Sequence, residues 1–268
     1  MRRTGRITGL LLIGLLAYVL FLLAGMPAAL AWQWGGQRLA PQVRAYGIAG
    51  TIWDGQAEAI VSGPRRVDNV RWDIRPSALL KGRLGARLVA AFPDGRAQAV
   101  VEASPGGTVT AEDVKADMDI DSLLALAGRQ GLSGAADGHF EALFQSLVAS
   151  GGRLRTAQGV LNWNGARVGL GQKISLGDLA LRIRPAGDNG VRGELVSSGG
   201  AFALEGDAAL RRDGGYQVEL RITPRNPSDP ATAQAVRVLG LANPRGTTVV
   251  NISGSLAGGT PRIQQHGG

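Results

Sequence analysis

Side chains that commonly carry acid–base or nucleophilic chemistry are scarce in this chain. Histidine occurs only as His139 and His266, and cysteine is absent. A Ser-His-Asp triad would have to use His139, yet no Gly-x-Ser-x-Gly elbow accompanies it. The lack of cysteine excludes thiolate metal sites, cysteine nucleophiles and thiol redox chemistry. We therefore expect no catalytic residues, no cofactor and no enzyme activity, and we interpret His139 as a surface residue of a strand.

A second group with chemical potential is the acidic row Asp117, Asp119 and Asp121, which resembles the opening of a calcium-binding loop. The glycine that such a loop needs at its sixth position and the acid at its twelfth are both missing. On a strand, alternate residues point to one face, so these carboxylates would line up beside Asp113. We expect a solvated acidic edge that ends in a helix cap, and no metal site.

The positive charge of the chain indicates no nucleic-acid partner. The formal net charge is +8, but Arg2, Arg3 and Arg6 directly precede an apolar run and supply three of these charges. The other arginines are scattered and mostly alternate with apolar residues, as the solvent face of strands would. No basic block with interleaved aromatic residues occurs, so a nucleic-acid surface is excluded.

Residues 7–31 are free of charge and long enough to cross a bilayer as one helix. The preceding arginines would stay in the cytoplasm, so the bulk of the chain would be periplasmic. The alternative is a cleaved signal peptide, because Ala29-Leu30-Ala31 fits an A-x-A cleavage site. The apolar run is longer than a typical signal core, which favours a retained anchor in the inner membrane.

The flanking segments follow from this anchor. Residues 1–6 form the cytoplasmic N-terminus, and Trp32 and Trp34 suit the outer membrane interface. Residues 32–44 then serve as a stalk, residues 45–257 form a periplasmic β domain, and residues 258–268 form a flexible polar tail.

Alternation of apolar and polar residues dominates the β domain. Val70, Trp72 and Ile74 alternate with charged residues, which predicts a strand with one buried face. Short helices are predicted at residues 77–80, 121–128 and 230–239, and many glycines separate the strands. The fold class is therefore mainly β: one transmembrane helix followed by an extended, twisted, mostly antiparallel sheet, in layers like those of AsmA and TamB proteins, with two or three short helices.

Residues 50–76 and 159–185 are equally long and resemble each other. Both begin with glycine, contain a tryptophan near a glycine, and end in Ile-Arg-Pro. Either they are a structural repeat that extends the sheet by similar layers, or two hairpins of a glycine-rich β protein look alike.

Several motifs resemble the type II secretion system protein N family. They are G-T-I-W-D-G at residues 50–55, V-R-W-D-I-R-P-S-A-L-L-K-G-R-L at 70–84, and D-G-G-Y-Q-V-E-L-R-I-T-P-R at 213–225. The resemblance implies a single-span inner-membrane component of a Gram-negative secretion machine, without catalytic residues. Its partners would be other inner-membrane subunits and, as a further candidate, the outer-membrane secretin. We expect exposed sheet edges to pair with strands of these partners.

A periplasmic lipid-handling or envelope-biogenesis protein of the AsmA or TamB type is the alternative, because such proteins carry similar hairpins. A lipid groove would need strands that are apolar on both faces, whereas most strands here alternate with Arg, Asp or Gln. The main exception is the stretch that contains Leu143, Phe144, Leu147 and Val148. If the chain is a secretion-system component, we expect no small-molecule substrate.

Overall fold

A computed structural model describes residues 14–15, 18, 21–36, 38, 41–63, 65–79, 81–92, 94–126, 134–169, 173–187, 190–241, 243, 245–255 and 262–267. One antiparallel sheet of 15 strands dominates this part of the chain. The strands are β1 (Val43–Tyr46), β2 (Ala49–Gly50), β3 (Asp54–Ser62), β4 (Arg65–Arg75), β5 (Leu84–Phe92), β6 (Gly95–Ala103), β7 (Thr108–Asp119), β8 (Ala136–Ser150), β9 (Arg153–Val168), β10 (Ile174–Pro185), β11 (Val191–Ser198), β12 (Phe202–Leu210), β13 (Gly215–Pro224), β14 (Thr248–Ser255) and β15 (Arg262–Gly267).

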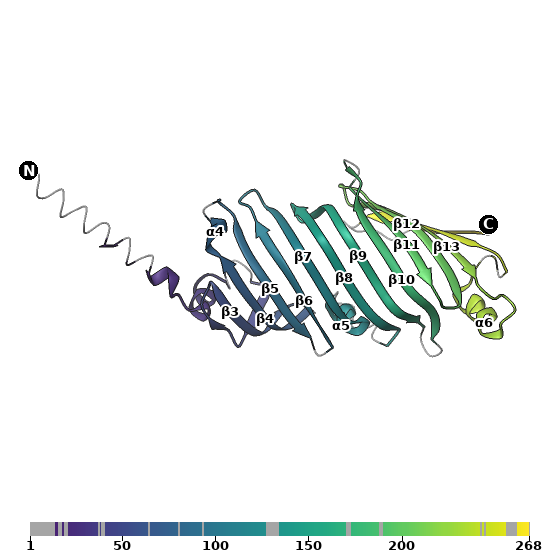
Figure 1. Ribbon diagram of the computed structural model, residues 1–268, viewed down its shortest axis with the longest axis horizontal. Coiled ribbons are helices and arrows are strands. Elements are labelled where there is room, and N and C mark those ends of the chain that lie inside the picture. Colours follow the sequence, from purple (N-terminus) through teal and green to yellow (C-terminus); the bar gives the residue numbers. More distant parts are fainter. Residues whose placement is uncertain are drawn as a thin grey trace, which may run out of the picture.

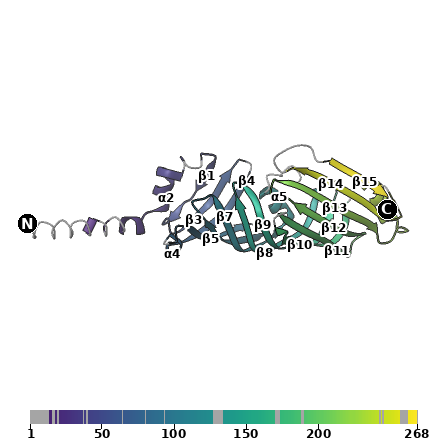
Figure 2. The same ribbon diagram turned by 90° about the horizontal axis from the view of Figure 1, so that it is seen from above.

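The strands follow one another in chain order from β3 to β15, with β1 and β2 both paired to β3. Figure 1 shows this meander as a long, twisted row of strands, and Figure 2 shows that the row curves. The prediction of a mainly β chain with an extended antiparallel sheet is confirmed. Layering of the AsmA or TamB kind stays a prediction.

Alternation places the apolar side chains of neighbouring strands on one face. Val70, Trp72 and Ile74 on β4 stand opposite Ala90, Leu88 and Ala86 on β5. The residues between them, such as Arg71 and Asp73, are exposed. Since directly opposite residues share a face, the apolar face continues from strand to strand across the meander.

Three short helices lie where the sequence predicts them: α4 (Pro76–Leu79), α5 (Ile120–Leu126) and α6 (Pro230–Leu239). Helix α6 has both of its expected ends. Asp229 accepts a hydrogen bond from the backbone N–H of Thr232 at 3.0 Å, and Gly240 adopts the left-handed conformation, with φ of 62°. Helix α2 (Ala28–Ala31) lies at the end of the segment predicted to form one helix, whereas the π-helical turn η1 (Trp32–Gly36) was not predicted.

The main core cluster lies under α6. Ala235 and Val236 of α6 and the following Leu241 pack with Phe202 and Leu204 of β12, and all five are at least 92% buried. We call the face of the sheet that α6 covers the inner face, and the opposite face the outer face. Alternation along β12 then assigns its alternate residues after Leu204 to the inner face as well.

Three boundaries differ from the prediction. The sheet begins at Val43, inside the segment expected to be a stalk. Residues 153–168 form one continuous strand, where the sequence predicts two strands at 154–163 and 166–170, because a β-bulge takes up Gly165 between them. Residues 262–267, assigned to a flexible tail, form β15, whose backbone pairs with β14 although all its side chains are exposed.

The predicted anchor lies only partly in the described residues, because 1–13, 16–17 and 19–20 fall outside them. Among the described residues no helix is both long and apolar enough to cross a bilayer. The last part of the segment contacts the sheet. Ile52 donates its backbone N–H to the carbonyl of Met26 at 3.1 Å, and Pro27 forms an isolated β-bridge with Thr51.

The two similar segments do not share one register. If they were equivalent at fixed spacing, the pair Gly55–Trp72 would correspond to Asn164–Leu181, but Leu181 stands opposite Leu161. Both segments form antiparallel pairs in the same sheet, and a repeat beyond that level stays a prediction.

Candidate functional site

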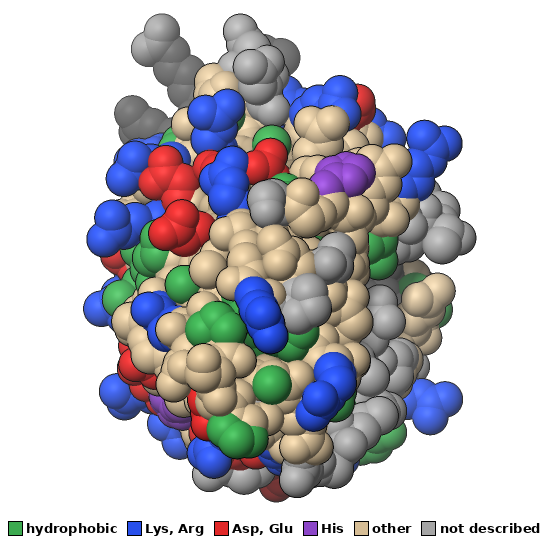
Figure 3. All heavy atoms as spheres, turned by 90° about the vertical axis from the view of Figure 1, so that its right-hand side faces the viewer, with side chains coloured by type: hydrophobic (Ala, Val, Ile, Leu, Met, Phe, Trp, Pro, Cys, Tyr) green, Lys and Arg blue, Asp and Glu red, His purple; other side chains and the backbone are tan. Residues whose placement is uncertain are grey.

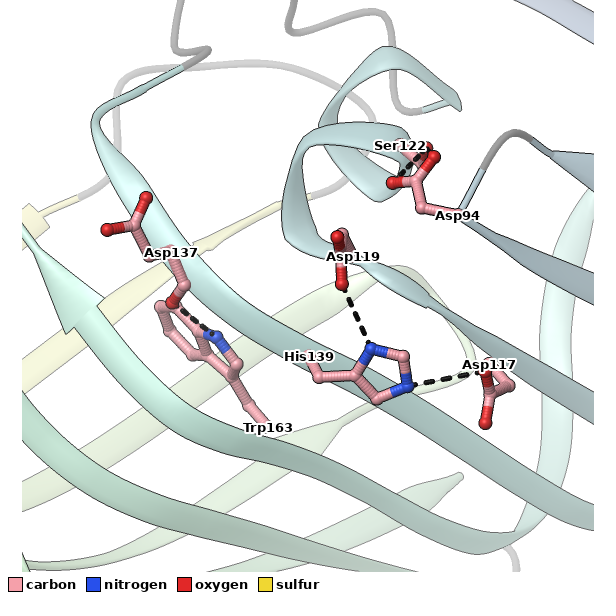
Figure 4. Close-up of polar contacts among 7 residues, drawn as sticks. All are labelled: Asp94, Asp117, Asp119, Ser122, Asp137, His139 and Trp163. Carbon is pink, nitrogen blue, oxygen red and sulfur yellow. Dashed lines mark hydrogen bonds and ion pairs between the residues drawn. The ribbon is translucent and has the colours of Figure 1, made fainter.

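His139 of β8 lies between two carboxylates of β7 on the outer face (Figure 4). Its Nδ1 is 3.0 Å from Asp119 Oδ1, and its Nε2 is 3.3 Å from Asp117 Oδ1. Only the doubly protonated imidazolium can donate from both nitrogens at once. The hydrogen bond to Asp119, with that to Asp117, raises the pKa of His139 above 6.5, although burial acts in the opposite direction.

The ion pairs of His139 with Asp117 and Asp119 connect strand β8 to strand β7. Asp117, His139 and Glu141 each offer a ligand atom, and these atoms lie within 4.8 Å of one another. A metal ion bound there would replace the ion pairs that His139 makes as an imidazolium. The side chains of Asp117 and His139 are also 56% and 37% exposed to solvent. The sequence prediction of a strand-surface histidine beside an acidic row is consistent with this geometry.

The other carboxylates of this region hold local structure. Asp121, at the start of α5, accepts a hydrogen bond from the backbone N–H of Gly134 at 3.2 Å. Ser122 donates to the carboxylate of Asp94, which joins α5 to the β5–β6 turn (Figure 4). The acidic row therefore ends in contacts that fix a helix. His266 lies on β15 opposite Val249 and is exposed.

Basic side chains are spread over the molecule. Viewed from the C-terminal end, they lie apart from one another, both over the face and around its edge (Figure 3). Arg66 pairs with Asp68, Arg83 with Glu102, Arg221 with Glu219, and Lys173 with Asp137. Among the residues that the structure describes, these cations are spread over separate strands, as the sequence predicts for the solvent face of a sheet.

The inner face carries an apolar groove where α6 does not cover it. The groove has a volume of about 340 Å³ and crosses six strands, β8 to β13. Its lining residues are Phe144, Leu147, Leu154, Ala157, Leu181, Ile183, Val191, Gly193, Ala208, Ala209, Leu210, Tyr216 and Val218. Most are only half-buried, so the described part of the chain leaves this apolar surface without a complete cover.

A basic cavity of about 260 Å³ adjoins the groove at one end. Arg153 after the β8–β9 turn and Arg211 and Arg212 in the β12–β13 turn line it. Leu154 and Leu210 line both cavities. The guanidinium of Arg212 donates to the carbonyl of Gly187, and that of Arg211 lies beside Gly215.

The sheet has two edges. At one, β1 and β2 pair with β3, and Trp32 and Pro41 border β1. At the other, β15 has all six residues exposed, and β14 is its only partner among the described strands. Each outermost strand directs alternate backbone N–H and C=O groups away from the sheet.

Comparison with known families settles the relationship of the chain. The family model of type II secretion system protein N matches residues 41–251, which run from the residues before β1 into β14. The chain belongs to this family. No curated protein and no solved structure matches the chain.

In this member of the protein N family, the G-T-I-W-D-G motif joins the N-terminal segment to the sheet. Thr51 Oγ1 accepts hydrogen bonds from the backbone N–H groups of Trp53 and Asp54, which tightens the turn. The indole N–H of Trp53 donates to the carbonyl of Leu23 at 2.8 Å, and that of Trp72 to the carbonyl of Ile52 at 3.2 Å. These tryptophans are half-buried and serve as donors to backbone.

Sequence reasoning missed the groove because it asked for strands that are apolar on both faces. The structure shows that one apolar face suffices where helices cover only part of it. On β10, Leu181 and Ile183 line the groove, whereas Arg182 and Arg184 line an outer-face pocket. The sequence could have indicated the groove, because it predicts many strands with one apolar face and only a few short helices to cover those faces.

Proposed function

We propose that this chain is a non-enzymatic inner-membrane component of the type II secretion system, which helps export folded proteins from the periplasm across the outer membrane. In this proposal, residues 7–31 are a single-span anchor, the N-terminus is cytoplasmic and the sheet is periplasmic. The sheet acts through contacts with other inner-membrane subunits, and the outer-membrane secretin is a further candidate partner.

The observation that carries the proposal is the family match over residues 41–251. The uncharged stretch of residues 7–31, preceded by three arginines, supports the membrane placement. The scarcity of histidine and the lack of cysteine in the whole chain support a role in binding rather than catalysis.

The working contact that we propose is strand addition at a sheet edge. Main-chain hydrogen bonds give affinity in such contacts, and alternate side chains of the added strand give specificity. The described sheet offers β1, which lies inside the family match, and β15, which lies beyond it. Testing each edge separately therefore shows whether the contact lies within residues 41–251, which match the family model, or beyond them.

The test uses proline at consecutive positions of each edge strand: Arg44→Pro and Ala45→Pro on β1, and Gln264→Pro and Gln265→Pro on β15. In each pair one amide faces the neighbouring strand and the other faces outward. The outward proline should preserve the melting temperature and remove crosslinks to other secretion subunits in membranes. The inward proline should lower the melting temperature, because it deletes a ladder hydrogen bond.

Alanine at the outer-face residues Arg182 and Arg192 is the matched control and should leave the crosslinks intact. If these alanine variants abolished secretion and crosslinking while every edge proline had no effect, edge pairing would not be the working contact. Membrane placement has its own test. A protease added to intact cells should digest the sheet of the full chain only after the outer membrane is opened, and the protein should resist extraction by high salt.

A further inference from the structure

Two carboxylates on the outer face stand directly opposite each other. Asp117 of β7 is in register with Glu141 of β8, and like charges at opposite positions destabilise a sheet. The carboxylate of Glu141 is half-buried and takes part in no hydrogen bond or ion pair with the described residues. Arg96 is opposite Asp117 on β6, yet no ion pair joins these two side chains in the described part of the chain. Glu141 therefore lacks a cation partner, although its burial makes one favourable.

His139 completes a set of three ligand atoms beside these carboxylates. It lies two positions from Glu141 on β8, so the two side chains share the outer face. One ligand atom each of Asp117, His139 and Glu141 lies within 4.8 Å of the others. Donor atoms about 2.0–2.2 Å from a tetrahedral zinc ion stand about 3.4 Å apart. Small side-chain rotations therefore suffice to bring the three donors around one ion.

Asp119 holds the imidazole ring in the orientation that a metal requires. It is in register with His139, and its Oδ1 is 3.0 Å from Nδ1 of the ring. A histidine that binds a metal through one nitrogen commonly donates the N–H of the other to a carboxylate, which fixes the tautomer. Here Nδ1 faces Asp119, so Nε2 is left on the side of Asp117 (Figure 4).

The donor set selects among divalent cations. Magnesium and calcium prefer oxygen ligands alone, whereas imidazole suits zinc and other transition metals. One nitrogen and two carboxylate oxygens fit zinc, which keeps an open position in sites with three protein ligands. The set differs from the acidic row of the sequence, because Glu141 of the neighbouring strand joins it. Asp121 instead accepts a hydrogen bond from the backbone N–H of Gly134.

We propose that Asp117, His139 and Glu141 bind one Zn²⁺ ion that joins β7 to β8, with Asp119 as a positioning residue. On binding, Nε2 of His139 releases its proton to solvent and gives its lone pair to zinc, while Nδ1 keeps its proton and its hydrogen bond to Asp119. Water takes the fourth position. In the metal-free chain the ion pairs described above remain. The site lies on the outer face, apart from the edges β1 and β15, and does not rest on the proposed function.

Isothermal titration of the full chain in detergent, freed of metal by a chelator, tests the proposal with zinc chloride. The original chain should bind one zinc ion, and its melting temperature should rise with added zinc, because a ligand of the folded state stabilises that state. His139→Gln and Glu141→Gln should not bind at the zinc concentrations that saturate the original chain. His266→Gln and Glu112→Gln are matched controls and should bind normally, since both residues are exposed and lie outside the set.

Glu141→Gln also separates the loss of a ligand from the loss of the fold. It removes a charge that stands opposite Asp117, so the metal-free variant should melt no lower than the metal-free original chain. Asp119→Asn should weaken zinc binding about 10- to 100-fold, the usual effect of changing a residue that orients a ligand. Nitrogen NMR of isotope-labelled histidine should show zinc at Nε2 of His139 and the proton at Nδ1.

The proposal is wrong if the folded, metal-free chain takes up no zinc, or if Glu141→Gln binds it as tightly as the original chain. It is also wrong if His266→Gln removes binding while His139→Gln does not, since the site would then lie on β15. Equal affinity for magnesium, calcium and zinc would likewise overturn it, because an acidic edge would then attract cations without the imidazole. None of these results bears on the edge-proline experiment, so the two proposals fail independently.

Discussion

His139 shows how a single residue can join two long strands on an exposed face. Its two ring nitrogens meet Asp117 and Asp119, which are two positions apart on β7 and therefore on the same face. The imidazolium thus replaces a repulsion between neighbouring carboxylates with two ion pairs. These ion pairs stabilise the folded chain at a pH where His139 is protonated, and less at a higher pH.

The pH dependence has a defined sign. Because the carboxylates raise the pKa of His139 in the folded chain, its stabilising effect is complete below the ordinary value of 6.5 and is lost as the pH rises through the raised value. His139→Gln should therefore lower the free energy of unfolding at about pH 6, by at most about 1 kcal/mol for an exposed pair. Denaturant unfolding of both proteins measures this difference.

At about pH 9, His139→Gln and the original chain should be nearly equal in stability. Arg66→Gln is the control, because Arg66 pairs with Asp68 at 2.8 Å and arginine stays charged in both conditions. A stability difference for His139→Gln that does not change between these conditions would assign its effect to packing.

Gly55 leaves the space that the side chain of Trp72 occupies. A Cβ atom at this position would lie 2.4 Å from Cζ2 of Trp72 and 2.7 Å from the carbonyl oxygen of Thr51. Gly55→Ala should therefore destabilise the chain by about 1–3 kcal/mol through overpacking. Gly35→Ala has no atom within 4 Å of its new Cβ and should be nearly neutral. Thermal melting compares the two, and equal melting temperatures would contradict the steric argument.

At the scale of elements, α6 defines what part of the inner face is covered. It combines an N-terminal cap at Asp229, proline at its first position and a left-handed Gly240 at its end. These local signals fix its length to the ten residues of Pro230–Leu239. Its buried residues Ala235 and Val236 cover one part of the apolar inner face, and the groove lies in the part that α6 leaves uncovered.

Removing the cap should loosen this cover. Asp229 accepts hydrogen bonds at 3.0 Å from both the backbone N–H and the hydroxyl of Thr232, which is 3% exposed. Asp229→Ala should cost about 0.5–2 kcal/mol of stability. Asp229→Asn keeps a side-chain acceptor and should lose less. Urea unfolding monitored by circular dichroism measures both, and an equal loss in the two variants would argue against a capping role.

The elements differ in how far the sequence could predict them. The strands around Trp72 and helix α6 were predictable because their signals are local: alternation, proline, glycine and a cap. Strand β15 was not, because its sequence is polar and its pairing depends on the free edge of β14. The groove was also missed, since it depends on which part of a shared face α6 leaves uncovered.

At the scale of the whole molecule, the strands of the sheet pair almost only with their neighbours in sequence. Contacts between elements follow the same order, and the longest strands, β8 and β9, make the most extensive pairing. Such an arrangement resembles repeat proteins, in which stability is close to a sum over neighbouring units. Local opening should therefore begin at the ends of the row.

Hydrogen exchange of backbone amides tests this gradient. In the full chain, amides of β8 and β9 should exchange most slowly, and those of β1 and β15 most quickly, since edge strands have one partner and β1 has only four residues. Uniform exchange rates from β3 to β14 would contradict this and would indicate that the sheet opens as one cooperative unit.

The meander also sets a length. From β1 to β15 the path contains 14 strands, with β2 to one side, and hence 13 steps between neighbours. At about 4.8 Å a step, the path along the curved sheet measures about 60 Å. Hydrogen bonds from Trp53 and Ile52 to Leu23 and Met26 hold its first strands against the N-terminal segment. In an anchored chain, the sheet is then a spacer of defined reach, which one added hairpin would lengthen by about 10 Å.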